Sequence, residues 1–333
     1  MKLRVETASE RADEAGLSVQ KRSLRFRSDG TFTIAQFADV HNGGDAPEDR
    51  LSLALIERVL ELERPDLAVF TGDLIRRGPD ARAQFAEVTA CAADAGIPYA
   101  FVFGNHDSRK DATRAELMEQ ERRQPYCVAE AGPESLGGVG NYTIPIEGSR
   151  PADAPAAALY FFDSECNAPD WACIDGRGEW IGSDKADWYA AESARLTERS
   201  GGPLPALAFF HIPLPEYEEV WQSRVCYGSK YAEVRCPALN VGLFAAMVEG
   251  GDVMGTFVGH DHSNDYWGEL AGIRLCYGRA SGFNGTVVGG LQRGSRLIRL
   301  REGERGFQTW IRLADGTAEP SQPEHLPEQS SHS

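Results

Sequence analysis

The sequence predicts an α/β fold in which a single domain contains two β-sheets. Over residues 31–107, short apolar segments alternate with segments of helical periodicity, the pattern of a parallel sheet covered by helices. From residue 273 onward the apolar residues instead fall into strand-like runs. No linker of distinct composition divides the 333 residues, so we expect one domain over residues 21–315.

The N-terminal part of this domain is expected to alternate between strands and helices. Residues 24–27 and 31–38 predict a hairpin with Gly30 at its turn. Apolar periodicity and the Pro and Gly residues at the boundaries then predict, in order, a helix at 47–64, a strand at 66–73, a helix at 79–95 and a strand at 99–107.

The rest of the chain is expected to contain more strands than helices. Residues 131–156 are rich in Gly and Pro and predict loops around a strand at 141–146. The later elements are predicted to be strands at 158–165, 206–214, 253–262, 273–278, 295–302 and 306–315, and helices at 184–199 and 237–249. The polar segment 1–20 is expected to be loosely ordered, and the Pro/Ser/Glu-rich tail 316–333 to be disordered.

Composition excludes some classes of function. A net charge of −16 argues against a protein that binds nucleic acid through a basic face. No segment is apolar enough over the length of a membrane span, and the charged N-terminus shows no signal-peptide core. The seven cysteines are scattered along the chain. This spacing and the lack of a signal-peptide core together favour a cytoplasmic protein with reduced thiols, although Cys226 and Cys236 could form a disulfide. The sequence does not indicate the oligomeric state.

Polar side chains follow five of the predicted strands. They are Asp39 and His41, then Asp73, then Asn105, His106 and Asp107, then His211, and finally His260 and His262. Five of the seven histidines occur at these positions, and the other two lie in the polar tail. Because ligands of α/β sheets bind beyond the carboxyl ends of the strands, we expect one sheet edge to bring these side chains together.

Each of these residues alone has a structural explanation. A single aspartate after a strand is usually a turn or capping residue, and a single histidine there is usually a hydrogen-bonded, half-buried residue. All five motifs in order favour a metal site instead. Carboxylate, amide and imidazole ligands suit Fe, Mn, Zn or Co, and in an extended segment His260 and His262 point to the same side. Each can therefore serve one of two adjacent metals, which a shared carboxylate can bridge.

The motifs DxH at 39–41, GD at 72–73, GNHD at 104–107, His211 and GHxH at 259–262 resemble those of the calcineurin-like metallophosphoesterases. The segments FFHIPLPEY, GHDHSNDY and GVGNY are similar to the purple-acid-phosphatase-like branch of that superfamily. The resemblance covers about residues 31–315. It implies a four-layer αββα sandwich, in which two mixed β-sheets are flanked by helices.

The resemblance also implies a role for each motif residue. Asp39, His41 and His262 would bind one metal, Asn105, His211 and His260 would bind a second, and Asp73 would bridge the two. His106 would act as the general acid, and Asp107 would orient it. Purple acid phosphatases have a tyrosine ligand three residues after the bridging aspartate, whereas this chain has Arg76. A purple Fe(III) centre is therefore not expected.

The expected activity is hydrolysis of small phosphomonoesters by a metal-bridging hydroxide, with two divalent or mixed-valence Mn, Fe or Zn ions as cofactors. A phosphodiesterase acting on nucleotides or lipid head groups is the alternative. A non-catalytic metal-binding scaffold is an alternative of another class. Three groups of residues carry two interpretations each: Asn264, Asp265 and Tyr266 line the pocket or cap a loop; Trp221, Tyr227 and Tyr231 stack on a leaving group or pack the insertion; and Arg109 meets a phosphate or is solvated.

Overall fold

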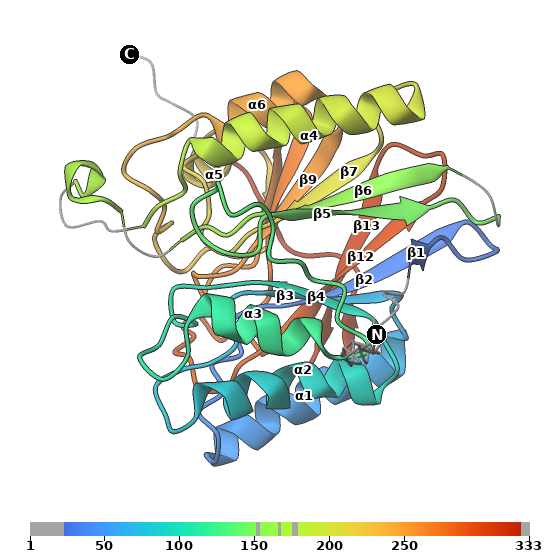
Figure 1. Cartoon of the computed structure of the whole chain (residues 1–333). Helices are drawn as coiled ribbons and strands as arrows, with labels where there is room; N and C mark the ends of the chain where they lie inside the picture. Colours follow the sequence, from blue (N-terminus) through green and yellow to red (C-terminus); the bar gives the residue numbers. More distant parts are fainter. Residues whose placement is uncertain (1–22, 151–153, 166–167, 175–178, 328–333) are drawn as a thin grey trace, which may run out of the picture.

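Two mixed β-sheets pack face to face, and helices cover the outer side of each sheet (Figure 1). The computed structural model describes residues 23–150, 154–165, 168–174 and 179–327. The expectations for residues 1–20 and for residues 328–333 lie outside this part of the chain. The four layers confirm the expected αββα sandwich.

The six-stranded sheet contains the alternating N-terminal elements. Its order is β14 (Ala318–Glu319), β13 (Phe307–Leu313), β12 (Gly294–Arg301), β2 (Thr31–Phe37), β3 (Leu67–Thr71) and β4 (Tyr99–Val102). The strands β2, β3 and β4 run parallel, as the alternation with helices predicts. The outer face is covered by α1 (Pro47–Glu63), α2 (Ala81–Asp94) and α3 (Arg114–Arg122) (Figure 1).

The nine-stranded sheet collects the later strands. Its order is β1 (Leu24–Arg25), β5 (Tyr142–Glu147), β6 (Pro155–Phe161), β7 (Ala206–Phe209), β9 (Val253–Val258), β11 (Ile273–Tyr277), β10 (Trp267–Leu270), β8 (Cys226–Tyr227) and β15 (Glu324–His325). The helices on this side of the molecule are α4 (Asp184–Ser200), α5 (Glu216–Ser223) and α6 (Leu243–Gly250), and a short 3₁₀ turn, η1, covers Asp170–Ala172 (Figure 1). The strands β6, β7, β9 and β11 are parallel neighbours, so their carboxyl ends share one edge.

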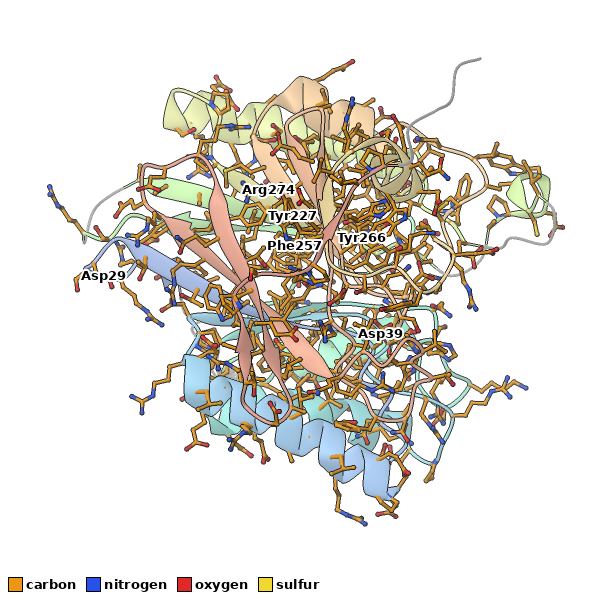
Figure 2. The ribbon with its side chains drawn as sticks, turned by 180° about the vertical axis from the view of Figure 1, so that it is seen from behind. Asp29, Asp39, Tyr227, Phe257, Tyr266 and Arg274 are labelled. Carbon is orange, nitrogen blue, oxygen red and sulfur yellow. The ribbon has the colours of Figure 1, made fainter. Side chains whose placement is uncertain are left out.

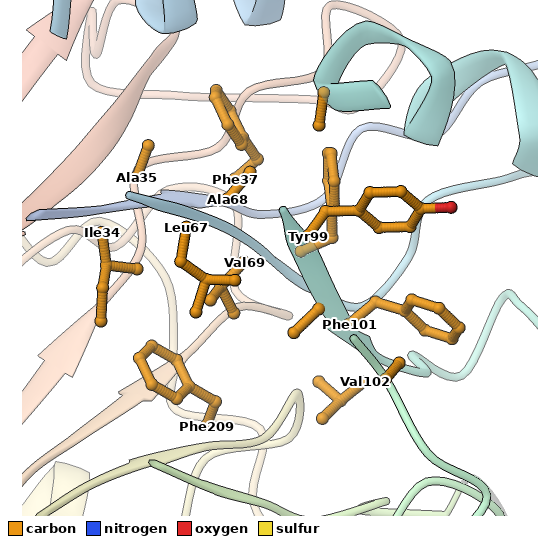
Figure 3. Close-up of a cluster of buried hydrophobic side chains, with 14 of the residues drawn as sticks. Ile34, Ala35, Phe37, Leu67, Ala68, Val69, Tyr99, Phe101, Val102 and Phe209 are labelled. Carbon is orange, nitrogen blue, oxygen red and sulfur yellow. The ribbon is translucent and has the colours of Figure 1, made fainter. Parts of the chain in front are cut away.

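The main hydrophobic core lies between the two sheets. Ile34, Leu67 and Val69 point from the six-stranded sheet toward Phe209 of β7 (Figure 3). The Phe209 ring stacks on Phe257 of β9 at a centroid distance of 5.2 Å. Each fully buried side chain of this size contributes about 1.5–3 kcal/mol. This packing fixes the position of one sheet relative to the other and hence the relative position of their edges.

The expected hairpin at residues 24–38 is wrong. Gly30 does form the turn, with φ 74°, but β1 pairs in parallel with β5 while β2 belongs to the other sheet. Leu24 is buried in the core, so the chain passes from one sheet to the other at this turn. Short-range alternation cannot distinguish this crossing from a hairpin, because both require a strand, a turn and a strand.

Two further expectations differ from the structure. The helix α3 was not predicted, although Thr113 and Glu116 form a capping box that marks its start. The expected disorder from residue 316 is wrong for residues 316–327, where β14 pairs with β13 and β15 pairs with β8. His325 also stacks on Trp221 at 3.7 Å between ring centroids. These contacts are distant in sequence, so local composition does not reveal them.

The structure also bears on the possible Cys226–Cys236 disulfide and on the search for a membrane-spanning segment. Cys226 is a free, buried thiol, so it is not joined to Cys236. Within the described ranges, no helix combines the length and the apolar content needed to cross a bilayer.

Candidate metal centre

The motif residues meet where the ends of the two sheets come together. Asp39 follows β2 and Asp73 follows β3, both in the six-stranded sheet, whereas His211 and His260 follow β7 and β9 of the nine-stranded sheet. Asp39 lies at the junction of the two halves of the molecule (Figure 2). The expectation of a single sheet edge is therefore corrected: two edges face each other, and each contributes part of the site.

A first cluster combines two carboxylates and two imidazoles. Asp39, His41, Asp73 and His262 each offer one ligand atom, and these four atoms lie within 4.8 Å of one another. The Nε2 atoms of His41 and His262 are 2.9 Å apart, and His41 Nε2 lies 3.6 Å from Asp73 Oδ2. His262 Nε2 lies 3.5 Å from Asp39 Oδ1. Donor atoms thus converge on one point from four positions in the chain.

A second cluster lies on the other side of Asp73. The ligand atoms of Asp73, His211 and His260 again lie within 4.8 Å of one another. His211 Nε2 is 3.4 Å from Asp73 Oδ2, 3.1 Å from Asn105 Oδ1 and 3.2 Å from His260 Nδ1. The same oxygen of Asp73 therefore faces His41 in one cluster and His211 in the other.

The backbone at this junction is held in unusual conformations. Asp39, His41, Asp73 and His260 have φ angles of 55°, 52°, 52° and 76°, in the left-handed region that non-glycine residues rarely adopt. Each such residue costs about 1–3 kcal/mol and persists only where the surrounding structure enforces it. Strain concentrated in these residues is typical of a functional site.

The glycines of the motifs are required by close packing. A Cβ atom on Gly104 would lie 2.2 Å from Asp73 Oδ1, and one on Gly259 would lie 2.8 Å from Asp39 Oδ2. Both distances are shorter than contacts between non-bonded atoms allow. The glycine that opens GNHD and the glycine that opens GHDH thus each leave space for a carboxylate from another loop.

Burial shifts the pKa values of the clustered groups. Burial, together with the nearby Asp73 carboxylate, raises the pKa of Asp39 to about 7, and burial lowers the pKa of His41 to about 3. Burial opposes ionisation of both Asp73 and His211, but their mutual attraction prevails, so the pKa of Asp73 falls and that of His211 rises to about 9. Buried carboxylate oxygens and imidazole nitrogens form a donor set that fits divalent transition metals, and a metal ion bound at His211 would displace its proton.

The GNHD loop is attached to Asp73 and to the loop after β3. The backbone N–H of His106 donates to Asp73 Oδ1 at 2.8 Å, while the His106 side chain is exposed, with its ring 5.0 Å from that of His41. Asp107 has a role other than the one expected. Its carboxylate accepts hydrogen bonds from the N–H groups of Gly104 and Ile75 at 2.8 and 3.1 Å. Within the described residues it therefore joins two loops and makes no hydrogen bond to the His106 ring.

A cleft of about 400 Å³ opens above the clusters. Its lining residues are Asp73, Asn105, His106, Ala232, Arg235, His260, Asp261, His262, Ser263, Thr286 and Val288. Arg109 is not among them. Its guanidinium donates to the backbone carbonyls of Arg76 and Gly78 and to Gln84 Oε1, so it fastens a loop and is neither a phosphate ligand nor a solvated side chain.

The residues that follow His262 hold loops together. Asp265 forms an ion pair with Arg279, and the Tyr266 hydroxyl donates to the carbonyl of Tyr217 at 2.7 Å. The Asn264 side chain bonds to the backbone of the insertion before β9. Of the two interpretations given for this trio, loop fastening is the one that the contacts support.

The aromatic residues of the insertion mostly pack against the protein. Trp221 stacks on His325, and Tyr227 stacks on Trp267 at 4.6 Å. Tyr231 is exposed and lies against Gly289. Packing of the insertion is therefore the role of the first two.

Sequence reasoning missed two charged contacts beside the clusters. Glu179 Oε1 lies 3.9 Å from His260 Nε2, the ring nitrogen other than the one that faces His211, and this interaction lowers the pKa of Glu179. This distance is longer than a hydrogen bond, and among the described residues His260 Nε2 is a buried nitrogen without a hydrogen-bond partner, so the contact is electrostatic only. No motif in the sequence marks Glu179, because its contact is with a residue that is distant in the sequence.

The second missed contact is a buried ion pair beside the GNHD loop. Arg114 Nη1 donates to Asp163 Oδ1 at 2.6 Å, and Nη2 donates to the carbonyl of Gly104 at 2.7 Å. Asp163 also accepts the N–H of Val139 at 2.7 Å, which attaches the GVGNY segment to the same point. The capping box at the start of α3 would have located Arg114, but not its partner.

The family model of the calcineurin-like phosphoesterases matches residues 32–264, a range that includes every residue of both clusters. The chain belongs to the calcineurin-like phosphoesterase family. Metal dependence is a property of that family, and the two donor clusters give this member candidate metal-binding residues.

Curated relatives place the chain near the purple acid phosphatases. "Probable inactive purple acid phosphatase 29" of Arabidopsis thaliana is 32% identical over 90% of this chain and 86% of the relative. "Probable inactive purple acid phosphatase 28" of the same plant is 33% identical over 88% of this chain and 83% of the relative. "Phosphatase DCR2" of Saccharomyces cerevisiae is 31% identical over 87% of this chain and 55% of the relative.

Solved structures share the fold at low sequence identity. A dimetal phosphatase from Danio rerio superposes with a TM-score of 0.56 at 15% identity, covering 84% of this chain and 98% of that chain. GAP50 of Plasmodium, described as the anchor in the inner membrane complex, gives a TM-score of 0.52 at 13% identity, with 90% of each chain covered.

Proposed function

We propose that the protein is a binuclear metal-dependent phosphoesterase that hydrolyses small phosphomonoesters. The observation that carries the proposal is the position of Asp73, whose Oδ2 atom faces both donor clusters beneath the cleft. Asp39, His41 and His262 would hold one metal ion, Asn105, His211 and His260 would hold the other, and Asp73 would contact both.

Bound metal ions would act as Lewis acids, lowering the pKa of a coordinated water and offsetting the charge that develops on the phosphoryl oxygens. The donor set fits Mn, Fe or Zn. At the position of the purple-acid-phosphatase tyrosine stands Arg76, which supplies no ligand oxygen. The left-handed backbone of four of these residues and the packed glycines support the proposal, because the seven candidate ligand side chains already lie close together.

His106 would transfer a proton to the leaving group. It lies on the cleft wall, and its backbone is fixed to Asp73 while its ring remains exposed. An imidazole in this position can donate a proton to the oxygen of the departing alcohol, a step that general acids accelerate by about 10²–10⁴-fold. Asp107 supports this placement indirectly, because it closes the loop that carries His106.

The first test is the metal content of protein purified without chelator, measured by mass spectrometry. Hydrolysis of p-nitrophenyl phosphate and of bis-p-nitrophenyl phosphate is then compared on the same preparation. We expect about two transition-metal ions per chain and a higher kcat/KM for the monoester. A strong preference for the diester would instead establish the phosphodiesterase alternative.

A non-catalytic scaffold is the second candidate, because the names of the Arabidopsis relatives contain the words "probable inactive". The presence of His106 and of every candidate ligand in this chain favours catalysis. Protein that binds two metal ions but turns over neither phosphoester, at any pH between 5 and 9, would establish the scaffold.

A further inference from the structure

The insertion before β9 is fastened to the loop that carries His260 and His262. Asp261, between the two histidines, accepts the backbone N–H of Arg235 on Oδ2 at 3.1 Å and the Tyr277 hydroxyl on the same atom at 2.7 Å. Asn264 Oδ1 accepts the N–H of Ala232 at 3.0 Å. The residues between and after the candidate ligands thus fix the insertion at the cleft.

This attachment places one cation in the cleft. Among the described residues that line it, Arg235 is the single Lys or Arg, and its side chain is exposed. Within the described part of the chain its guanidinium makes no hydrogen bond or ion pair, in contrast to Arg109, and only the longer-range charges of Glu179 and Asp261 act on it. In a protein of net charge −16, a guanidinium without a hydrogen-bonded partner beside the proposed phosphoryl site is available to an anionic ligand.

The surroundings of Arg235 indicate which part of a ligand would contact its guanidinium. Asp261 directs its carboxylate to Tyr277 and the insertion, so Arg235 stands on the insertion side of the cleft, whereas His106 is attached to Asp73. Ala232 and Val288 add apolar surface to the cleft wall. A cleft of about 400 Å³ lies within the range of sites that hold a whole small molecule, so it has room for more than a phosphoryl group.

We propose that Arg235 determines substrate specificity by binding a second anionic group on the leaving-group side of the phosphomonoester. The substrate would carry a carboxylate or a second phosphate, separated from the reacting phosphoryl group by an apolar frame. A guanidinium suits either anion, because its planar N–H groups match two oxygens at once. This inference rests on the proposed function for the site of the reacting phosphoryl group.

Binding of phosphonates, which are not hydrolysed, tests the inference without turnover. The probes are benzylphosphonate, 4-carboxybenzylphosphonate and p-xylylenediphosphonate, titrated by calorimetry into the Mn²⁺-reconstituted protein. The variant is Arg235→Gln, and the control is Arg224→Gln, an exposed arginine of the same insertion that does not line the cleft. We expect Arg235→Gln to weaken one or both doubly anionic probes by about 10- to 100-fold more than benzylphosphonate. Arg224→Gln should leave this selectivity unchanged.

The probe that loses affinity in the Arg235→Gln variant identifies the anion, since the carboxylate probe and the diphosphonate probe are titrated separately. An equal loss of affinity for all three probes would mean that Arg235 binds the reacting phosphoryl group, and this result would overturn the inference. The inference would also be overturned if Arg235→Gln lost no affinity for any probe, or if no probe bound to the wild-type protein. Failure of the proposed function has a different signature: selective binding through Arg235 with no hydrolysis of the corresponding phosphate esters.

Discussion

Replacing Arg114 with Met should destabilise the protein and disturb the GNHD loop together. The guanidinium and the Asp163 carboxylate are 9% and 0% exposed, and they meet at 2.6 Å. Methionine preserves much of the aliphatic volume but leaves a buried carboxylate without its cation, which costs about 3–5 kcal/mol. The carbonyl of Gly104 also loses a donor, and a small shift of the adjacent His106 should lower kcat by about 10- to 100-fold.

Urea denaturation in the presence of a chelator measures the loss of stability in Arg114→Met, since bound metal would otherwise add its own stabilisation. Arg123→Met is the matched control: Arg123 follows α3 directly and pairs with Glu119, but both side chains are more than 60% exposed, so its loss should cost less than about 1 kcal/mol. The reasoning is refuted if Arg114→Met also costs less than about 1 kcal/mol. It is refuted equally if the cost is large while the coupling between Arg114→Met and Asp163→Asn in a double-mutant cycle is near zero.

Three further predictions concern single side chains. His106→Ala should retain both metal ions by mass spectrometry yet lose about 10²–10⁴-fold in kcat, whereas loss of metal would show that His106 is structural. Asp73→Asn should lower the occupancy of both metals, and Asp111→Asn, an exposed carboxylate outside the cleft, should lower neither; loss of one metal alone would contradict sharing by Asp73. Burial raises the pKa of Glu216, so the folded state favours the protonated carboxyl group. The stability that this group contributes is therefore present below pH 4 and is lost as the pH rises through the raised pKa. Glu216→Gln should therefore gain stability relative to wild type between pH 4 and pH 7 in urea denaturation, and an unchanged difference between the two pH values would exclude this account.

Local patterns predicted most of the elements that build the site. The strands ending before Asp39, Asp73 and Asn105 were predicted within a few residues, because apolar runs bounded by polar residues report burial directly. The failures were of another kind. The strand that pairs with β1 is more than a hundred positions away, and the carboxylate that pairs with Arg114 beside Gly104 is 49 positions away; periodicity contains no information about such partners.

The sequence alone determined the chemical types of the donors and the strand ends that carry them, since both depend on residue identity and short-range spacing. Only the tertiary structure decided that Asp73 Oδ2 faces both clusters, that Asp107 joins loops instead of holding His106, and that Arg235 reaches the cleft. Asp39 and His260 are separated by 221 positions, and they meet because the side chains between the two sheets pack in one arrangement. The packing free energy of the whole core sets that arrangement, and no single stretch of sequence specifies it.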